Sequence, residues 1–131
     1  MTGPWPGGVQ TIAPYFTVED ADRLIDFLAA AFGARLTQIS RYDDGSVQHA
    51  RMQIGECILM INQRTEAYPA NISQMHIYAD DLQSAFVAAL DCGATELMAP
   101  NRRPHGDLMA GVKDPCGNIW WIAQPGSDAG R

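Results

Sequence analysis

An internal repeat is the feature that most constrains what this chain of 131 residues can fold into. Residues 15–20 (YFTVED) lead into an apolar run that ends in Phe-Gly-Ala at Gly33. Residues 76–81 (HIYADD) lead into a similar run that ends in Cys-Gly-Ala at Gly93, and strand-like sequence follows each glycine. Because copies of one supersecondary unit bury a continuous core only against each other, the repeat predicts one domain built from two similar modules.

Each copy contains one predicted helix. The two helices cover residues 19–32 and 82–92, where apolar side chains recur every three or four residues and therefore share one face. Acidic residues stand at the start of both runs, where they can cap the first turn and complement the helix dipole. The glycine after each run supplies the left-handed stop. Both helices are therefore expected to face the core rather than a membrane or a partner.

The rest of each copy has the composition of strands. We predict them at residues 11–18, 34–41, 47–54 and 57–63 in the first copy, and at 73–79, 95–99, 108–112 and 119–123 in the second. Each copy then has the order β-α-β-β-β. The expected fold class is α+β, with two βαβββ modules forming a curved mixed sheet around a ligand cavity and the helices on the outer face.

The same pattern sets the boundaries along the chain. It predicts a flexible N-terminal lead-in (1–9), a first module (10–63), a linker (64–72), a second module (73–124) and a C-terminal tail (125–131). The two modules make up one domain, residues 10–124. The lead-in is expected to be poorly ordered unless Trp5 finds a surface to cover.

Charge and composition argue against several classes of protein. The net charge is −6, from 9 Lys+Arg against 15 Asp+Glu, and the pI is about 4.8. A nucleic-acid partner is not expected, because phosphate binding needs clustered basic side chains. No membrane is expected either, since no apolar run approaches the roughly 20 residues of a span and no secretory signal opens the chain. Three cysteines without C-x-x-C spacing indicate a reducing, cytoplasmic compartment.

Several short stretches of the chain resemble the vicinal oxygen chelate superfamily, which includes glyoxalase I, extradiol dioxygenases, bleomycin-resistance proteins and the PhnB-like group. They are residues 15–20 and 76–81, the Phe-Gly-Ala and Cys-Gly-Ala ends of the two helices, residues 47–50 (VQHA) and residues 112–120 (VKDPCGNIW). Their order and spacing carry the resemblance over residues 10–124. The resemblance implies the paired βαβββ fold and, as is usual for relatives of this size, a homodimer.

The resemblance also implies where a metal would be held. Metal-dependent members carry ligands at four strand positions that face the cavity, and those positions fall here on Ala13, Met60, Gln74 and Trp121. Alanine has no ligating atom and tryptophan does not ligate, whereas a catalytic zinc takes about three protein ligands from His, Glu, Asp or Cys. We therefore expect the inherited metal site to be lost, and we predict no metal and no other cofactor.

Strand alternation indicates what faces the cavity instead. We expect an aromatic and apolar pocket with a few polar groups, which is the usual make-up of a site for a small organic ligand. The candidate ligand-binding residues are Tyr15, His49, Met60, Gln74, His76 and Trp121. Tyr15 and Trp121 could stack on a planar group, although aromatic residues on a sheet face are also common as plain core. Arg51 shares the strand face of His49 and could bind an anionic group, or form a surface salt bridge.

Three functions remain open at this point. The favoured one is a metal-free, glyoxalase/bleomycin-resistance-like protein that binds or sequesters a hydrophobic or aromatic compound such as an antibiotic. The alternative is a metal-dependent lyase, isomerase or dioxygenase that uses a rearranged set such as His49, Gln74 and His76. The third is a metal-free enzyme in which one of these histidines is the acid–base group. No catalytic residue is assigned.

Overall fold

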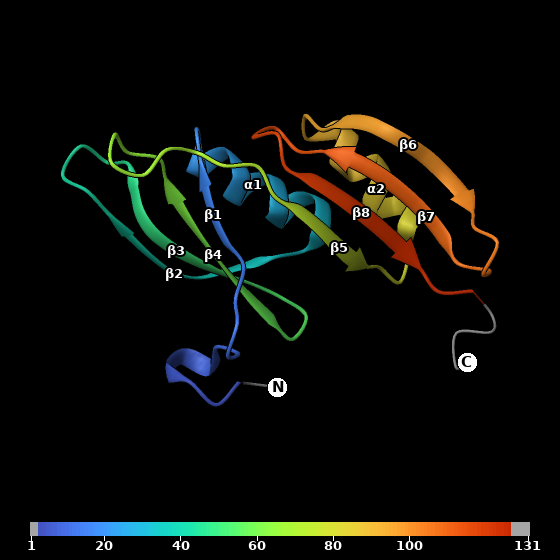
Figure 1. Ribbon diagram of the computed structural model, residues 1–131, viewed down its shortest axis with the longest axis horizontal. Helices are drawn as coiled ribbons and strands as arrows, with labels where there is room; N and C mark the ends of the chain where they lie inside the picture. The colour runs from blue at the N-terminus through green and yellow to red at the C-terminus, as the bar shows by residue number, and fades with distance from the viewer. Residues whose placement is uncertain (1–2, 127–131) are drawn as a thin grey trace.

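A computed structural model describes residues 3–126 as two four-stranded mixed sheets, each with one helix. The first sheet has the order β1-β4-β3-β2 and contains β1 (Tyr15–Val18), β2 (Arg35–Arg41), β3 (Val47–Ile54) and β4 (Cys57–Gln63). The second has the order β5-β8-β7-β6 and contains β5 (Gln74–Tyr78), β6 (Thr95–Arg102), β7 (Leu108–Lys113) and β8 (Ile119–Gln124). The helices are α1 (Ala21–Phe32) and α2 (Leu82–Asp91). The predicted pair of βαβββ modules is confirmed (Figure 1).

The boundaries differ from the predicted ones at a few ends, for local reasons. Helix α1 begins at Ala21 because Asp20 is its N-cap, with a side chain that accepts a hydrogen bond from the Arg23 amide. Strand β1 begins at Tyr15 rather than at residue 11, directly after Pro14, which has no N–H to donate. Strand β6 runs past its predicted end to Arg102, and a register shift near Pro100 accommodates the proline on this edge strand.

Equivalent pairings and hydrogen bonds stabilise each of the two modules. In each module the first strand pairs in parallel with the last, β1 with β4 and β5 with β8. A glutamine at the end of the last strand then accepts a hydrogen bond from the first amide of the helix: Gln63 from Ala21 and Gln124 from Leu82, both at 2.9 Å. These bonds satisfy helix amides that would otherwise lack a partner, so each helix is tied to its own sheet.

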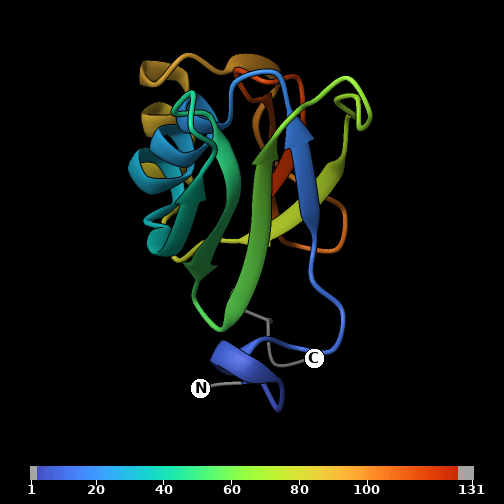
Figure 2. The same ribbon diagram turned by 90° about the vertical axis from the view of Figure 1, so that its left-hand side faces the viewer.

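The core lies between the sheets and the helices, which occupy one side of the molecule (Figure 2). The modules meet through α1 and α2 and through aromatic side chains: the Trp120 ring stacks on Phe16 with 5.8 Å between ring centroids and lies 5.1 Å from Phe32. Within residues 3–126, no strand pairing joins the two sheets. The cavity-lining sheet expected to be continuous is therefore two sheets, which are held side by side by the helical layer (Figure 1).

The Asp-Pro-Cys-Gly-Asn turn between β7 and β8 serves the fold rather than the chemistry. Asp114 is buried, and its carboxylate accepts hydrogen bonds from the Cys116 and Asn118 amides and from the Trp120 indole N–H, at 2.8 to 3.0 Å. Asn118 is also buried and accepts a hydrogen bond from the Ser73 amide, just before β5. This turn therefore fixes Trp120 in the core and joins β8 to the linker.

The N-terminal segment is anchored to the first sheet. Gln10 mimics a strand partner, because its side chain donates to the Ile58 carbonyl at 2.7 Å and accepts from the Ile58 amide at 3.1 Å. The short 3-10 turn η1 (Pro6–Gly8) precedes it, and the Trp5 indole N–H donates to Thr11. The predicted lead-in is described from Gly3 onward, and the predicted tail only as far as Gly126. Across residues 3–126, no helix has the length and apolarity that crossing a membrane requires.

Candidate functional site

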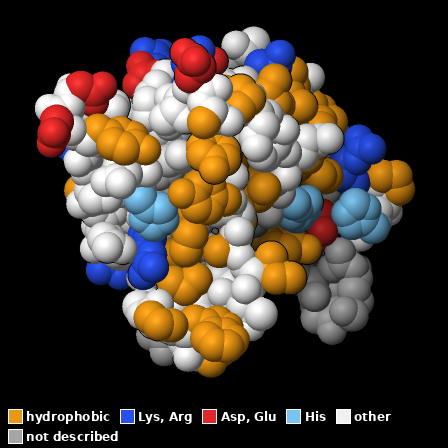
Figure 3. Space-filling view, turned by 60° about the vertical axis from the view of Figure 1, so that its left-hand side comes forward, with side chains coloured by type: hydrophobic (Ala, Val, Ile, Leu, Met, Phe, Trp, Pro, Cys, Tyr) orange, Lys and Arg blue, Asp and Glu red, His pale blue; other side chains and the backbone are white. Residues whose placement is uncertain are grey.

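Each sheet has a buried face under the helices and an open face on the opposite side. On β1, Phe16 and Val18 are buried while Tyr15 is exposed, and on β8 Trp120 and Ile122 are buried as the alternation predicts. Strand register then defines the open face across both sheets. Its positions are Tyr15, Thr17, His49, Arg51, Met60 and Asn62 in the first sheet, and Gln74, His76, Tyr78, Met109, Gly111, Ile119, Trp121 and Ala123 in the second. Figure 3 shows apolar side chains in a band between histidine side chains on this side of the molecule.

On the first sheet, Tyr15 and His49 meet above a hollow of about 590 Å³. Their ring centroids lie 5.8 Å apart at a tilt of 52°. Thr17, on the neighbouring rung of the ladder, donates its hydroxyl to the Asn62 side-chain oxygen at 2.7 Å. Tyr42 and Tyr68 also line this hollow, from the turn after β2 and from the linker. The hollow therefore combines aromatic walls with a polar floor.

A second hollow, of about 330 Å³, adjoins the first along the same open face. Met60, which pairs with Tyr15 across the β1–β4 ladder, and Arg51, which pairs with Met60 across β3–β4, form its floor. The N-terminal segment closes it from above with Trp5, Pro6, Val9, Gln10 and Thr11. The N-terminal lead-in thus contributes directly to the candidate site.

On the second sheet, the Trp121 indole spans three strands. Its six-membered ring lies over Gly111 of β7, where an added Cβ would stand 2.4 Å from Cζ3 of the ring. Its indole N–H reaches the other way and donates to the Gln74 side-chain oxygen of β5 at 2.9 Å. Only glycine leaves room for this arrangement. The indole therefore lies across the sheet, with its six-membered ring packed on Gly111 and its N–H bonded to Gln74, and part of its surface is exposed.

His76 and Tyr78 continue the second open face along β5. Their rings meet edge to face, with centroids 4.9 Å apart. His76 pairs with Trp121 across the β5–β8 ladder. The structure therefore brings Gln74, His76 and Trp121 together on the second sheet, and Tyr15, His49 and Met60 together on the first.

Two side chains that could act in acid–base or nucleophilic chemistry, His49 and Cys116, have pKa values shifted by their surroundings. Burial, and secondarily the charge of Arg51, lower the pKa of His49 and so favour its neutral form. Burial raises the pKa of the Cys116 thiol to about 11, which makes it a poor nucleophile.

The residues at the four inherited metal positions do not fit a metal. Ala13 lies before β1 and offers no donor atom. The Gln74 oxygen already accepts the Trp121 N–H, and the Met60 thioether is a soft ligand. No group of three or more His, Cys, Asp or Glu side chains that could hold a metal ion occurs among residues 3–126. His49 and His76 of the alternative metal set lie on different sheets.

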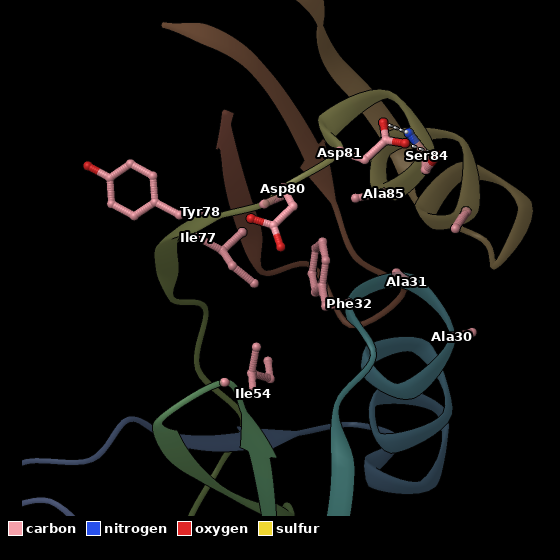
Figure 4. Close-up of a pocket in the computed structure, with 13 residues that line it drawn as sticks. Ala30, Ala31, Phe32, Ile54, Ile77, Tyr78, Asp80, Asp81, Ser84 and Ala85 are labelled. Atoms are coloured by element: carbon pink, nitrogen blue, oxygen red, sulfur yellow. Dashed lines mark hydrogen bonds between the residues drawn. The ribbon is translucent and has the colours of Figure 1, made fainter. Parts of the chain in front are cut away.

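A further hollow, of about 500 Å³, lies where the two modules meet, between the end of α1 and the start of α2 (Figure 4). Its walls are alanine side chains with Phe32, Ile54 and Ile77. Asp81, at its edge, is engaged as the N-cap of α2 by the Ser84 amide and hydroxyl. Tyr78 points away from it in the same view. This hollow is separate from the open face that carries the candidate residues.

Sequence reasoning missed several parts of the open face. Gly111 was not singled out, although a glycine inside a strand pattern signals a close approach. Trp5 belongs to the predicted lead-in, Gln10 follows it directly, and Tyr68 belongs to the predicted linker. No periodic pattern marks these segments, so the sequence does not indicate that they reach the open face. Their place in the site depends on how the chain returns to the sheet.

Comparison with known proteins agrees with this architecture. Residues 9–122 match the Glyoxalase/Bleomycin resistance protein/Dioxygenase superfamily. An uncharacterised protein of Mycobacterium bovis is 29% identical over 127 residues, covering 87% of this chain and 82% of the relative.

Solved structures show the same fold. The structure of TioX from Micromonospora sp. ML1 superposes with a TM-score of 0.74 at 24% identity, covering 86% of this chain and 96% of TioX. The PhnB protein from Bacillus cereus gives a TM-score of 0.68 at 18% identity, covering 88% of this chain and 99% of PhnB. With the family match extending over nearly both modules, this chain belongs to the Glyoxalase/Bleomycin resistance protein/Dioxygenase superfamily.

Proposed function

We propose that this chain is a metal-free binding protein whose open face takes up a hydrophobic or aromatic small molecule, such as an antibiotic. The observation that carries the proposal is the Trp121 indole, laid flat over Gly111 and fixed by Gln74. An indole already held in place loses little side-chain entropy when a planar ligand stacks on it. Stacked aromatic pairs contribute about 0.5–1.5 kcal/mol beyond the area they bury.

The donor set at the inherited metal positions supports the metal-free part of the proposal. Alanine, methionine, glutamine and tryptophan occupy them, and two of the four side chains are hydrogen-bonded to each other. The antibiotic as a ligand class rests on the family, whose description includes bleomycin resistance. The proposal therefore concerns binding and sequestration rather than turnover.

We also propose a homodimer in a reducing, cytoplasmic compartment. Strands β1 and β5 are edge strands, and large apolar side chains near them are exposed, including Ile12 (85%), Ile72 (71%) and Tyr78 (67%). Edge strands with exposed apolar neighbours favour association with another chain. All three cysteines are free thiols, which suits a reducing compartment. Sedimentation equilibrium of the purified protein tests the dimer.

The binding experiment uses 2-naphthamide, a neutral planar probe, in isothermal titration calorimetry on EDTA-treated protein. We expect binding to the wild type, a loss of about tenfold or more in Trp121→Ala, and a smaller loss in Trp121→Phe, which keeps a ring. Val87→Ala is the control, because Val87 is an exposed apolar residue on α2, in the helical layer. Equal binding by wild type and Trp121→Ala would refute the role of the indole.

Metal content decides between this proposal and the metal-dependent alternative. The untagged protein is incubated with zinc, nickel, manganese or iron(II), dialysed and examined by mass spectrometry. We expect no stoichiometric metal. Stoichiometric metal that disappears in His49→Ala or His76→Ala would overturn the metal-free proposal and direct attention to lyase, isomerase and dioxygenase assays.

A further inference from the structure

Arg51 is a polar residue of the open face with a buried side-chain donor that has no hydrogen-bond partner among residues 3–126. Its Nε atom is buried without a hydrogen bond, and no residue in the range 3–126 forms a hydrogen bond or ion pair with its guanidinium. Two arginines outside the open face are paired: Arg41 with Asp22, and Arg64, at the start of the linker, with Glu19. A buried donor without a partner costs free energy that the fold does not recover here.

The surroundings of Arg51 are apolar and lack a counter-charge. It lines the hollow of about 330 Å³ beneath the N-terminal segment, and no Asp or Glu is among the residues lining that hollow. One Nη atom lies against Gly7 of the 3-10 turn, where an added Cβ would stand 2.5 Å away. Gln10 clamps the segment that forms this roof onto β4. The N-terminal turn therefore lies against one side of the guanidinium, and none of the residues lining the hollow carries a negative charge to neutralise it.

His49 does not supply the missing partner. His49 lies two residues before Arg51 on the same face of β3. Burial first, and the charge of Arg51 second, lower the pKa of His49. A neutral imidazole offers hydrogen bonds without opposing an incoming negative charge. The net charge of −6 does not exclude an anion here, because exposed charges more than about 8 Å away are largely screened at physiological ionic strength.

Building on the proposed function, we propose that the ligand of the open face is an organic acid whose carboxylate is bound by Arg51 in the hollow beneath the N-terminal segment. The planar guanidinium presents paired donors that match a carboxylate. Met60, Trp5 and Pro6 provide the apolar walls against which the carbon skeleton of the acid would lie. The partner missing from the protein is thus supplied by the ligand.

Matched probes separate this proposal from the proposed function. Calorimetry compares 2-naphthoate with the isosteric neutral 2-naphthamide and with the cationic 2-naphthylmethylammonium. We expect the wild type to bind the naphthoate about tenfold or more tightly than the amide, since hydrogen bonds to charged groups are the strong ones. Arg51→Met should lose that preference, so that it binds the naphthoate no more tightly than the amide, and Arg51→Lys should keep part of it. Arg35→Gln, which removes an exposed arginine bonded to Gln53, is the control.

The outcomes distinguish the two ideas. If the amide and the naphthoate bind equally, or if the cationic probe binds best, the carboxylate site is wrong while aromatic binding stands. If the naphthoate binds through Arg51 but the amide does not bind at all, the anion site stands and the neutral aromatic function fails.

Thermal unfolding provides a readout that does not depend on a ligand. Arg51→Met should unfold at the same temperature as the wild type or a higher one, because an unpartnered buried donor is removed. A lower unfolding temperature together with an unchanged preference for the naphthoate would show that Arg51 serves the fold, and would overturn the proposal.

Discussion

The open face of the first module carries a positive charge, that of Arg51, whereas the open face of the second carries the Trp121 indole at the corresponding place. Met60 in the first sheet and Trp121 in the second occupy equivalent rungs, since each pairs in parallel with the first strand of its module, at Tyr15 and at His76. Their partners across the next ladder differ in the same way: Arg51 lies beside Met60, and Gly111 beside Trp121. One module thus uses a guanidinium where the other leaves room for an indole.

The framework beneath those faces is the same in both modules. The aspartate N-caps, Asp20 and Asp81, accept hydrogen bonds from the same relative amide, and Gln63 and Gln124 each accept from the first amide of a helix. If the proposed binding function holds, specificity is expected to depend on the open faces, which differ between the modules, and not on the caps and glutamine contacts, which both modules keep. The differences between the modules, rather than their likeness, indicate the ligand chemistry.

The largest expected effect concerns the two equivalent turns, β3–β4 and β7–β8. Asp114→Ala should lower the free energy of unfolding by about 3 kcal/mol or more, because it leaves two amides and the Trp120 indole N–H without their buried acceptor. Glu56→Ala, in the short turn of the first module, should change it by less than about 0.5 kcal/mol, since Glu56 is exposed. Urea titration of both variants measures the contrast. Similar losses in the two variants would show that the Asp114 network does not distinguish the modules.

A smaller effect tests how the second module holds its indole. Gly111→Ala places a methyl group 2.4 Å from the Trp121 ring, so the ring must move. We expect a loss of about 1–3 kcal/mol in stability, as in other overpacked sites, and weaker binding of 2-naphthamide. In a Trp121→Ala background the same substitution should cost almost nothing, because the clashing ring is gone. A penalty that persists in that background would locate the strain in the backbone rather than against the indole.

Much of this fold could be predicted from the sequence because its signals are local. The strands β3 and β4 match their predicted bounds, and the end of α1 at Phe32 follows directly from Gly33 in the left-handed conformation. Burial of Trp120 beneath the helices agrees with strand alternation once Trp121 is placed toward the cavity, as the family resemblance implies. What could not be predicted is the separation of the sheets, since it depends on how α1 and α2 pack against each other.

The candidate site was less accessible to prediction for a related reason. Placement of Tyr15, His49 and Trp121 on the open face required only the strand period and the cavity-facing positions that the family resemblance implies. The lack of a partner for the Arg51 guanidinium required knowing every side chain around it, including Trp5 and Gln10 from a segment without periodic pattern. Whether a side chain lacks a hydrogen-bond partner depends on the folded structure, and no local sequence pattern predicts it.

The smallest expected effect links Arg51 to its neighbour and can be read from the titration of His49. The pKa of His49 is below its usual value of about 6.5, first because of burial and second because of the Arg51 charge. Arg51→Met removes the second cause only, so the pKa of His49 should rise but stay below 6.5 in an NMR titration. Arg35→Gln, whose side chain bonds to Gln53, should leave it unchanged.

The same shift makes the stability of the protein depend on pH. Because the folded pKa of His49 is lower than the unfolded one, the unfolded chain binds more protons between the two values. Stability is therefore fully present above about pH 6.5 and falls as the pH drops from there toward the folded pKa. His49→Gln should flatten this part of the stability profile, measured by urea titration between about pH 5 and 7. Arg51→Met should flatten it partly, since the burial of the imidazole remains; a steeper profile in that variant would mean that the two side chains do not share the first open face as the strand register places them.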